Sequence, residues 1–575
     1  MILYHLLLEF FERIIYWFTQ YGVFMNQNKL MAELLFPNVN TTIEDLDVRF
    51  PKRSEDAVVT RFAPSPTGFL HIGGVYTALM NAKLAHQNGG VFMLRIEDTD
   101  KKREVPNSKG IICEIFSRFG IQIDEGVISE TEQKGAYGSY IQSERIDIYH
   151  TVAKYLVETG YAYPCFCSEE ELNEIRAEQE ELKVAPGYYR EYAKYRNVSL
   201  EEATQKLEEK GSFVLRFRVP DDINDRVGVE DLIKGYIEME NNINDFVLLK
   251  ENGIPTYHFA HCCDDHFMGT TIVMRGDEWI ASLPIHVELF TACGFELPRY
   301  AHVAPVMKLD GESRRKLSKR KDPESSAEYY LELGYPIRAL FVYLYTLINS
   351  NFEEWYLANK DANLDDFEMK FENMSISGAL YDLTKLNSIS SEIIYNTSIE
   401  ENVKNQLAWA KEYDQEVYAR LTSDIELVHR LFATQGPDSS EHRKDLNCYQ
   451  DFMHVFGPLY NDVFESNNEV YNELIEENLP KDVRSEIVNE FINYFEEKHA
   501  GSEKTLKDLS KELGYVDKKK YMKNPEAYKG ITTQFYKGLR LLLTHQEHGI
   551  AMDDIVSVLG HDEVIRRLKL ELWLI

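Results

Sequence analysis

Residues 58–100 read VVTRFAPSPTGFLHIGGVYTALMNAKLAHQNGGVFMLRIEDTD, and they carry the clearest signal for the fold class. Its two apolar ends, Val58–Phe62 and Val91–Ile96, are typical of buried strands, whereas Ala and Leu recur at helical spacing after Gly73-Gly74. Two prolines and a glycine after the first run exclude both a helix and a central strand there. Strand, loop, helix and strand make one βαβ unit, which predicts a parallel sheet.

Ligands of parallel sheets bind beyond the carboxyl ends of the strands. The loop of residues 61–74 and the acidic end Glu97–Asp100 are therefore both placed for chemistry. Glycines in the loop let backbone N–H groups approach an anion, and the N-terminus of the following helix favours negative charge. His71 can donate a hydrogen bond to a phosphate oxygen.

A second segment whose side chains could take part in a reaction is KLSKR, residues 316–320. Mobile ammonium groups of such a segment stabilise the charge that builds up when a phosphate is attacked. Taken alone, each segment has an ordinary reading: HIGG as a helix cap, and the basic cluster as a solvated surface or a loose nucleic-acid patch. The chemistry is predicted only when the two are read together.

The rest of the chain predicts two architectures, α/β first and helical second, joined near residue 370. From Glu328 onward the pattern is almost wholly helical. Upstream of that point we expect a helix at residues 169–183, strands at 212–219 and 272–275, a hairpin of 246–250 with 254–260 through Asn252-Gly253, and a helix that ends near Cys293.

The length and net charge of the chain limit what kind of protein it can be. A chain of 575 residues is expected to hold two or more domains. Its 63 basic and 95 acidic side chains give a net charge of −32, which taken alone argues against a nucleic-acid partner. RNA binding needs only a locally basic face, however, and Lys504–Lys529 combines lysines with Tyr515, Tyr521 and Tyr528. An ordinary charged helical surface explains this island equally well.

The seven scattered cysteines predict reduced thiols in a cytoplasm rather than a disulfide scaffold. Met1–Phe24 is very apolar, but Glu9, Glu12 and Arg13 interrupt it, which leaves fewer than the ~20 apolar residues that a membrane helix needs. It also lacks the marks of a signal or transit peptide. We therefore expect no membrane partner. Two interpretations stay open, an amphipathic helix and an upstream start codon with Met25 as the natural first residue, and we favour the second.

Five segments in order, RFAPSPTG…HIGG, RIEDTD (95–100), PTYHFA (255–260), RGDEW (275–279) and KLSKR, resemble bacterial-type glutamyl-tRNA synthetases, a family of class I aminoacyl-tRNA synthetases. The resemblance covers about residue 25 to the C-terminus and is sparse beyond about residue 350. It implies a Rossmann-like α/β catalytic domain with an inserted α+β acceptor-binding subdomain, followed by an all-helical anticodon-binding region.

The domain boundaries that this resemblance implies run as follows. Residues 1–56 are an N-terminal extension and linker, 57–160 the first catalytic half, 161–255 the inserted acceptor-stem-binding subdomain, 256–325 the second catalytic half with the KLSKR loop, 326–370 a stem-contact connection and 371–575 the anticodon-binding domain.

The resemblance also implies roles for single residues. A planar guanidinium such as that of Arg61 grips a carboxylate through two hydrogen bonds, which lysine cannot do. Glu97 matches the acid that meets the substrate's ammonium group, with an ion pair to Arg95 or Lys101 as its structural alternative; for Tyr257 the alternative is a core aromatic. The implied glutamate contacts are Arg61, Ala63, Ser65, Glu97, Tyr257, His261 and Arg275. The implied ATP contacts are Pro64, Thr67, Gly68, His71, Gly73, Gly74, Lys316, Ser318, Lys319 and Arg320, of which His71 and Lys319 are catalytic.

The chain departs from the family pattern at three places. His261 stands where the family often has Asn or another small residue, and Tyr76 stands where many members have Arg. Cys165-Phe-Cys167 resembles half of a zinc site, but residues 187–194 hold no second cysteine. Two thiolates do not complete a tetrahedral structural site, so we predict no structural zinc.

The implied activity is glutamate–tRNA ligation: Mg²⁺ and ATP serve to activate L-glutamate, which is joined to tRNA(Glu), and the resemblance leaves open whether tRNA(Gln) is charged too. A monomer is the family habit. A glutaminyl synthetase is the nearest rival, but that group has PEPNG and HIGH where this chain has PSPTG and HIGG. A second alternative is a short relative that glutamylates a modified base, but that protein lacks an anticodon domain. A third is an inactive RNA-binding paralogue, which would not need the intact Arg61, Glu97, His71 and Lys319.

Overall fold

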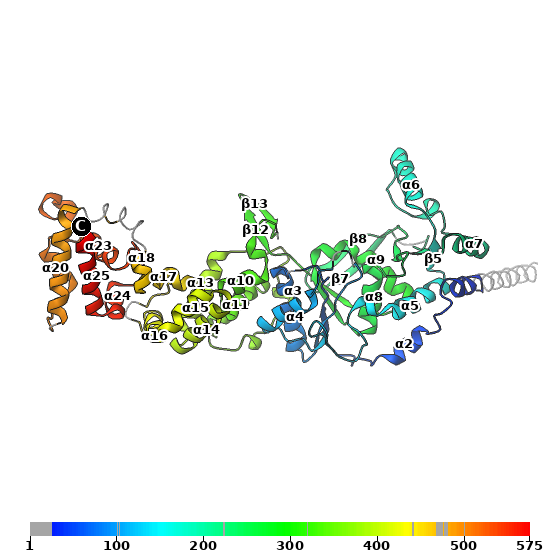
Figure 1. The fold of residues 1–575 in the computed structure, drawn as a ribbon. Coiled ribbons are helices and arrows are strands. Elements are labelled where there is room, and N and C mark those ends of the chain that lie inside the picture. The colour runs from blue at the N-terminus through cyan, green and yellow to red at the C-terminus, as the bar shows by residue number, and fades with distance from the viewer. Residues whose placement is uncertain are drawn as a thin grey trace, which may run out of the picture. The chain divides into compact units, whose positions relative to one another are not determined.

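The computed structural model describes residues 26–68, 70–100, 102, 104–221, 225–318, 320–439, 442–466, 475, 481–499 and 501–574. The predicted catalytic Lys319 and the segment Met1–Phe24 lie outside the described residues. The chain divides into two compact units. The first holds Met1–Glu328 with Leu344–Tyr381, and the second holds Tyr329–Tyr343 with Asp382–Ile575 (Figure 1).

The predicted βαβ unit is confirmed in the first unit. Strand β1 (Val59–Phe62) leads through the loop into α3 (Ile72–Gln87) and on to β2 (Val91–Leu94), which pairs with β1 in parallel. Next to β2 run β3 (Glu125–Val127), in parallel, and β4 (Gln133–Lys134), antiparallel at the edge. The carboxyl ends of β1 and β2 therefore lie at one edge, as the sequence predicted.

A second sheet continues this layer. Strand β10 (Ile272–Gly276) pairs in parallel with β11 (Arg299–Val303), after a connection through α9 (Leu283–Cys293). Outside β11 lie β7 (Arg226–Asp231) and β8 (Gly235–Glu240), a hairpin. The strand and the helix expected at 272–293 are confirmed.

Backbone hydrogen bonds place β10 beside β1. The amide of Thr271 donates to the carbonyl of Val59 at 3.0 Å, and the amide of Val59 donates to the hydroxyl of Thr271 at 2.8 Å. On α3, the buried side-chain amide of Asn81 donates to the carbonyl of Met274 at 3.1 Å. The loops after β1, β2 and β10 therefore open on the same side of the layer.

A smaller antiparallel sheet lies at another end of the first unit. It consists of β5 (Ala162–Cys165), β6 (Val214–Phe217) and β9 (Val247–Leu249) in that order. Two charged helices, α6 (Glu169–Leu182) and α7 (Leu200–Lys210), connect its strands and project away from it in Figure 1. The predicted helix at 169–183 and strand at 212–219 are confirmed.

The hairpin expected at 246–260 is wrong in its second half. Only Leu249 and Pro255 form a bridge, and from Tyr257 the chain is the helix α8 (Tyr257–Phe267). The apolar and aromatic residues of 254–260 are compatible both with a strand and with a buried helix. In the structure Phe259 and Ala260 are buried next to each other, as a helix in the core allows. Whether so short an apolar segment becomes a strand or a helix depends on the segments that pack against it. The local sequence pattern does not contain this information.

The remaining elements of the first unit complete its layers. Residues 26–35 are helical, and α2 (Ile43–Arg49) packs within the first unit, where Leu46 is fully buried and Arg49 donates to Asp147. The segment expected as a polar linker is thus partly structured. The other elements are α4 (Ser108–Arg118), α5 (Ile146–Glu158), the hairpin of β12 (Met307–Asp310) and β13 (Ser313–Lys316), and α12 (Phe352–Ala358).

The second unit is helical, as predicted, apart from two short strands. Its core is made of aliphatic and aromatic side chains from helices along the whole unit. Its elements are α13 (Leu383–Asn396), α14 (Ile399–Tyr413), α15 (Gln415–Ser423), α16 (Ile425–Ala433), α17 (Asp451–Phe456), α18 (Asn461–Ser466), α20 (Lys481–His499), α21 (Leu506–Glu512), β14 (Tyr515–Val516), α22 (Lys518–Lys523), β15 (Gly530–Ile531), α23 (Thr532–Thr544), α24 (Met552–Leu559) and α25 (His561–Leu574). The helices α10 (Ala327–Leu333) and α11 (Ile337–Ile348) each contribute residues to both units. Among the residues described, no helix combines the length and apolarity that a bilayer crossing requires.

One buried guanidinium joins several helices of the second unit. Arg567 of α25 has no solvent exposure and donates to the carbonyls of Pro458, Leu459 and Leu543 and to the side chain of Asn461. We expect Arg567→Met to lower the free energy of unfolding of this unit by about 3–5 kcal/mol, because it leaves buried acceptors without donors.

The neighbouring arginine supplies the control for this prediction. Arg566 is 39% exposed and pairs with Glu563 and Glu465 at the surface. Arg566→Met should cost less than about 1 kcal/mol. Urea unfolding followed by circular dichroism measures both variants, and equal losses would contradict the role given to Arg567.

Candidate functional site

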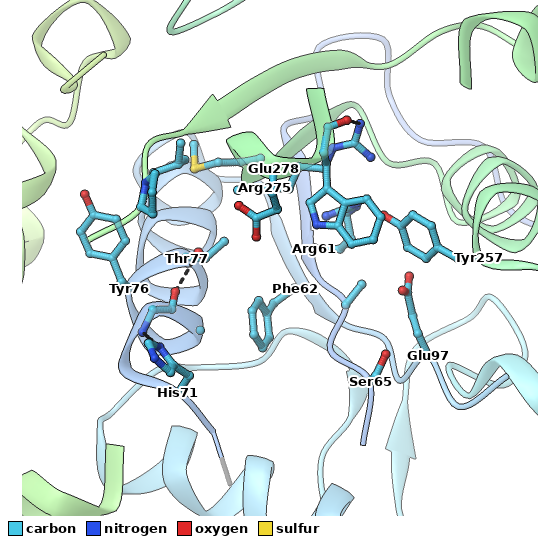
Figure 2. Close-up of a pocket in the computed structure, with 18 of the residues that line it drawn as sticks. Arg61, Phe62, Ser65, His71, Tyr76, Thr77, Glu97, Tyr257, Arg275 and Glu278 are labelled. Atoms are coloured by element: carbon cyan, nitrogen blue, oxygen red, sulfur yellow. Dashed lines mark hydrogen bonds between the residues drawn. The ribbon is translucent and has the colours of Figure 1, made fainter. Parts of the chain in front are cut away.

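A cavity of about 720 Å³ lies at the carboxyl ends of β1, β2 and β10. Figure 2 shows His71, Tyr76 and Thr77 on one side of it and Tyr257 and Glu97 on the other. The loop after β1 supplies one wall, and the segments after β10 and β11 supply another. A pocket beyond the strand ends is what the βαβ reading predicted.

Ten of the site residues named from the sequence line this cavity. They are Arg61, Ala63, Ser65, His71, Gly73, Gly74, Glu97, Tyr257, Arg275 and Lys316. Six others, Pro64, Thr67, Gly68, His261, Ser318 and Arg320, are not among the described residues that line it. The chain thus brings together residues more than two hundred positions apart, while the roles assigned to them remain predictions.

The guanidinium of Arg61 is held from behind by a buried carboxylate. Its Nε donates to both oxygens of Asp265, at 3.3 and 3.4 Å, and these are its hydrogen bonds among the described residues. Arg95 donates from Nη1 to the same carboxylate at 2.6 Å. Burial alone would raise the pKa of Asp265, but Arg95 and Arg61 hold it well below its usual range. The planar end of Arg61 is therefore oriented by a permanent anion.

Glu97 lies between this cluster and the cavity. Arg95 Nη2 donates to Glu97 Oε1 at 3.2 Å, so the ion pair considered for Glu97 is present and the side chain lines the cavity as well. Burial raises the pKa of Glu97 to about 7, although Arg95 and Arg61 act in the opposite direction. A carboxylate that is this poorly solvated gains from a cationic ligand.

Tyr257 begins α8 and faces the cavity rather than the core. Its ring lies 4.4 Å from that of Trp279, centroid to centroid. Burial raises the pKa of its hydroxyl to about 12, so it is a neutral hydrogen-bonding group at physiological pH.

His261 lies behind Tyr257 instead of on the cavity wall. The two rings stack with centroids 5.8 Å apart, and the side chain of His261 has no solvent exposure. Its Nδ1 is 2.9 Å from Oδ2 of Asp265. Burial lowers its pKa to about 4, which keeps the ring uncharged at pH 7. Because α8 turns position 261 inward, His261 is not among the described residues that line the cavity, and the glutamate contact implied for it stays a prediction.

The opposite side of the cavity is the N-terminus of α3. The backbone N–H of Gly73 donates to Nδ1 of His71 at 3.0 Å, so that His71 caps the helix. In the neutral ring the proton then lies on Nε2. A Cβ at Gly74 would stand 2.8 Å from Leu70 Cδ1, so a larger residue here would make the side chain of Leu70 move.

The KLSKR segment follows β13 and is anchored by Asp322. This buried carboxylate accepts from the backbone N–H of Ser318 at 2.9 Å and from both Nη atoms of Arg315. The hydrogen bonds from Arg315 lower the pKa of Asp322 well below its usual range. Lys316 reaches Glu278 at 3.4 Å across the cavity mouth. Asp322 thus holds the middle of the signature segment through Ser318 and the strand before it through Arg315.

Several residues that line the cavity were not predicted as site residues from the sequence. Tyr76, one of the departures from the family pattern, is buried and donates from its hydroxyl to the carbonyl of Leu347 at 3.3 Å. Glu278 and Trp279 belong to the RGDEW segment, so its full length could have indicated them. Thr77 and Lys250 carried no such signal, because their neighbours in space come from distant parts of the chain.

The thiol pair considered as half of a zinc site has a tyrosine as its neighbour. Cys165 Sγ and Cys167 Sγ each lie 3.4 Å from the hydroxyl of Tyr188. Over the described ranges, no three His, Cys, Asp or Glu side chains gather as metal ligands would. The absence of structural zinc stays a prediction.

Comparison with known proteins agrees with the geometry. Residues 57–387 match the model of the family described as tRNA synthetases class I (E and Q), catalytic domain. The chain is 43% identical to the glutamate–tRNA ligase of Clostridium perfringens strain SM101, over 94% of this chain and 98% of that protein. The corresponding ligase of Acetivibrio thermocellus is 42% identical, over 94% of this chain and 99% of its own length.

A solved structure supports the same assignment over both units. The glutamate tRNA ligase of Elizabethkingia meningosepticum, crystallised in complex with its amino acid, superposes with a TM-score of 0.68 at 27% identity and covers 89% of this chain and 98% of its own. With the family model and the relatives above, this shows the class I synthetase fold. The chain belongs to the class I tRNA synthetases of the glutamate and glutamine family.

Proposed function

We propose that this protein is a glutamate–tRNA ligase that activates L-glutamate with ATP and transfers it to tRNA. The observation that carries the proposal is that two guanidinium groups, Arg61 and Arg275, and the carboxylate of Glu97 line one cavity, whose lining also includes Asp100, Glu278, Lys250 and Lys316. Glutamate is the complement of the first three groups, with two carboxylates and one ammonium group. The ligase relatives of high identity support the same substrate.

The amino-acid end of the cavity would bind by charge-assisted hydrogen bonds. Arg61, oriented by Asp265 through Nε, presents the rest of its fork to a carboxylate. Glu97 would accept from the ammonium group, and the neutral hydroxyl of Tyr257 would donate or accept beside it. Ala63 and Ser65 line the cavity close to these groups. Glutamine would leave a guanidinium unmatched, which is the expected basis of discrimination.

The other end of the cavity suits the phosphates of ATP. The helix N-terminus favours an anion, Gly73 and Gly74 permit close approach of the backbone, and Nε2 of His71 would donate to a phosphate oxygen. Lys316, together with Lys319 in the same segment, would stabilise charge on the departing pyrophosphate. Mg²⁺ is expected to arrive on the phosphates of ATP, as it commonly does where substrates supply most of its ligands.

The reaction has two steps. A carboxylate oxygen of glutamate attacks the α-phosphorus of ATP, which forms glutamyl-adenylate and releases pyrophosphate. A ribose hydroxyl of the terminal adenosine of tRNA then attacks the acyl carbon, loses its proton and expels AMP. The protein's contribution is to hold the reactants in line and to stabilise phosphate charge.

The partners of the remaining regions follow from the same proposal. The α+β subdomain of residues 161–255 would contact the acceptor stem, and residues 371–575 would read the anticodon. In the second unit, α22 carries Lys518, Lys519 and Lys520, and Lys520 Nζ lies 5.2 Å from the ring centre of Tyr528. Lysines beside aromatic rings suit unpaired bases of RNA. A cytoplasmic monomer is expected, and whether tRNA(Gln) is charged as well is decided by the assay below.

Charging of purified tRNA transcripts with labelled glutamate tests the proposal. We expect the wild-type protein to charge tRNA(Glu) and Lys319→Ala to lose at least about a hundredfold in rate, because charge on the leaving pyrophosphate is no longer stabilised. Lys321→Ala, two residues further on, is the matched control and should retain activity. A folded wild type that charges neither tRNA(Glu) nor tRNA(Gln) would point instead to an inactive RNA-binding paralogue.

Glutamate use should depend on the protonation of Glu97. With a pKa of about 7 in the free protein, this carboxylate is ionised above pH 7 and protonated below it, so it loses its attraction for ammonium in acid. Between pH 8 and pH 6 we expect kcat/KM for glutamate to fall about tenfold. Glu97→Gln should abolish this dependence and lower kcat/KM at pH 8; an activity that is constant or rises toward pH 6 would refute the role.

Arg61→Lys should separate charge from geometry. Lysine keeps the positive charge beside Asp265 but cannot make two parallel hydrogen bonds to a carboxylate. We expect kcat/KM for glutamate to fall about a hundredfold, with KM for ATP little changed. Arg226→Lys, at a side chain that is 53% exposed and pairs with Glu238, is the control and should behave as wild type. Wild-type activity of Arg61→Lys would remove Arg61 from the binding site.

A further inference from the structure

Arg275, the second guanidinium of the cavity, is surrounded by histidines. It is the next-to-last residue of β10 and is 5% exposed. Its Nε donates to Nε2 of His302 at 3.1 Å, and its Nη2 lies 3.2 Å from Nδ1 of His286 and 3.4 Å from the carbonyl oxygen of Trp279. Two imidazole nitrogens therefore face a group that has only N–H donors.

This geometry assigns the tautomer of both rings. A guanidinium cannot accept a hydrogen bond and does not lose its proton in proteins, so the nitrogen that faces it must carry a lone pair. His302 then holds its proton on Nδ1, which lies 2.7 Å from Oδ2 of Asp231. His286 holds its proton on Nε2, which lies 3.1 Å from Nδ1 of His258. Each ring accepts from Arg275 and donates away from it.

The surroundings keep both rings neutral and immobile. Neither His286 nor His302 is exposed to solvent. Burial lowers the pKa of His286 well below its usual range, and burial likewise lowers the pKa of His302 despite its hydrogen bond to Asp231. Asp231 is itself fixed, because the backbone N–H groups of Ile233 and Lys234 donate to its Oδ1 at 2.9 and 2.8 Å.

The remaining terminal nitrogen of Arg275 has no protein partner. With Nε and Nη2 engaged, Nη1 is buried and has no hydrogen-bond partner within the described part of the chain, although Arg275 lines the cavity. We propose that His286 and His302 are positioning residues that orient the guanidinium of Arg275 as neutral hydrogen-bond acceptors, so that it meets a carboxylate of the substrate in a fixed direction. The proposal rests on the proposed function and adds the groups that set the geometry of its second arginine.

Amide side chains can place an acceptor at either ring position. The amide of Asn occupies roughly the place of Nδ1, and the amide of Gln roughly the place of Nε2. His286→Asn and His302→Gln therefore keep an acceptor toward Arg275. His286→Gln and His302→Asn keep only the contact on the far side, toward His258 and Asp231 respectively. The four variants thus form two matched pairs of almost equal size and polarity.

Steady-state charging of tRNA(Glu) by the full chain distinguishes the pairs. For His286→Gln and His302→Asn we expect KM for glutamate to rise about ten- to hundredfold, with KM for ATP within about threefold of wild type, because a hydrogen bond to a charged group is lost at the amino-acid end alone. His286→Asn and His302→Gln should stay within about threefold of wild type in both constants. Equal losses within each pair, or equal losses in both substrates, would overturn the proposal and indicate a merely structural role.

A measurement that needs no activity separates this proposal from the function on which it rests. In protein with ¹⁵N-labelled histidine, long-range ¹H–¹⁵N spectra report which ring nitrogen carries the proton. We expect His302 protonated on Nδ1 and His286 on Nε2, assigned with the single-site variants. Failure of the wild type to charge tRNA would refute the proposed function, whereas the opposite tautomers would overturn the positioning role whether or not charging occurs.

Discussion

The first unit is organised around two adjacent carboxylates that no water reaches. Asp264 and Asp265 lie on α8 with at most 1% exposure, and buried charge of this kind is tolerated only when it is paired and fully hydrogen-bonded. Arg145, Gln142 and Tyr149 donate to Asp264, while Arg61, Arg95 and Thr270 donate to Asp265. These partners come from β1, from the end of β2, from the turn before α5 and its first residues, and from the loop before β10, so satisfying the two anions fixes how α8 lies against the sheet.

The binding properties of the cavity follow from this pairing. Because Asp265 neutralises Arg61 from behind through Nε, the rest of the guanidinium keeps a fixed direction without a ligand. Arg95 is shared between Asp265 and Glu97, and the remaining burial leaves Glu97 with a raised pKa. On the other wall, His302 with Asp231 and His286 with His258 play the same part for Arg275. Both arginines are thus oriented in advance, which reduces the ordering that a substrate would otherwise have to impose.

The two ends of the cavity are built on different physical principles. The proposed amino-acid end uses buried, paired side chains whose directions are set by neighbours from α8, α9, β11 and the end of β2. The phosphate end uses a helix N-terminus and two glycines, where the backbone itself provides the donors and the favourable field. The signature segment after β13 joins the second end, with Asp322 holding it through Ser318 and Arg315. An enzyme that activates an amino acid with ATP needs both kinds of site within one cavity.

The βαβ unit, the helical second half, the family and ten of the residues that line the cavity could be predicted without the structure, because they depend on local periodicity and on motifs with rigid backbone requirements. The HIGG glycines, for example, are needed wherever a backbone approaches an anion. Contacts between distant segments determine that residues 257–260 begin a helix instead of continuing a strand, that His261 turns inward behind Tyr257, and that Arg49 of α2 pairs with Asp147. They also determine that His286 and His302 face Arg275. Burial, pairing of charges and the choice of a ring tautomer arise from groups brought together from distant positions, and no local pattern contains that information.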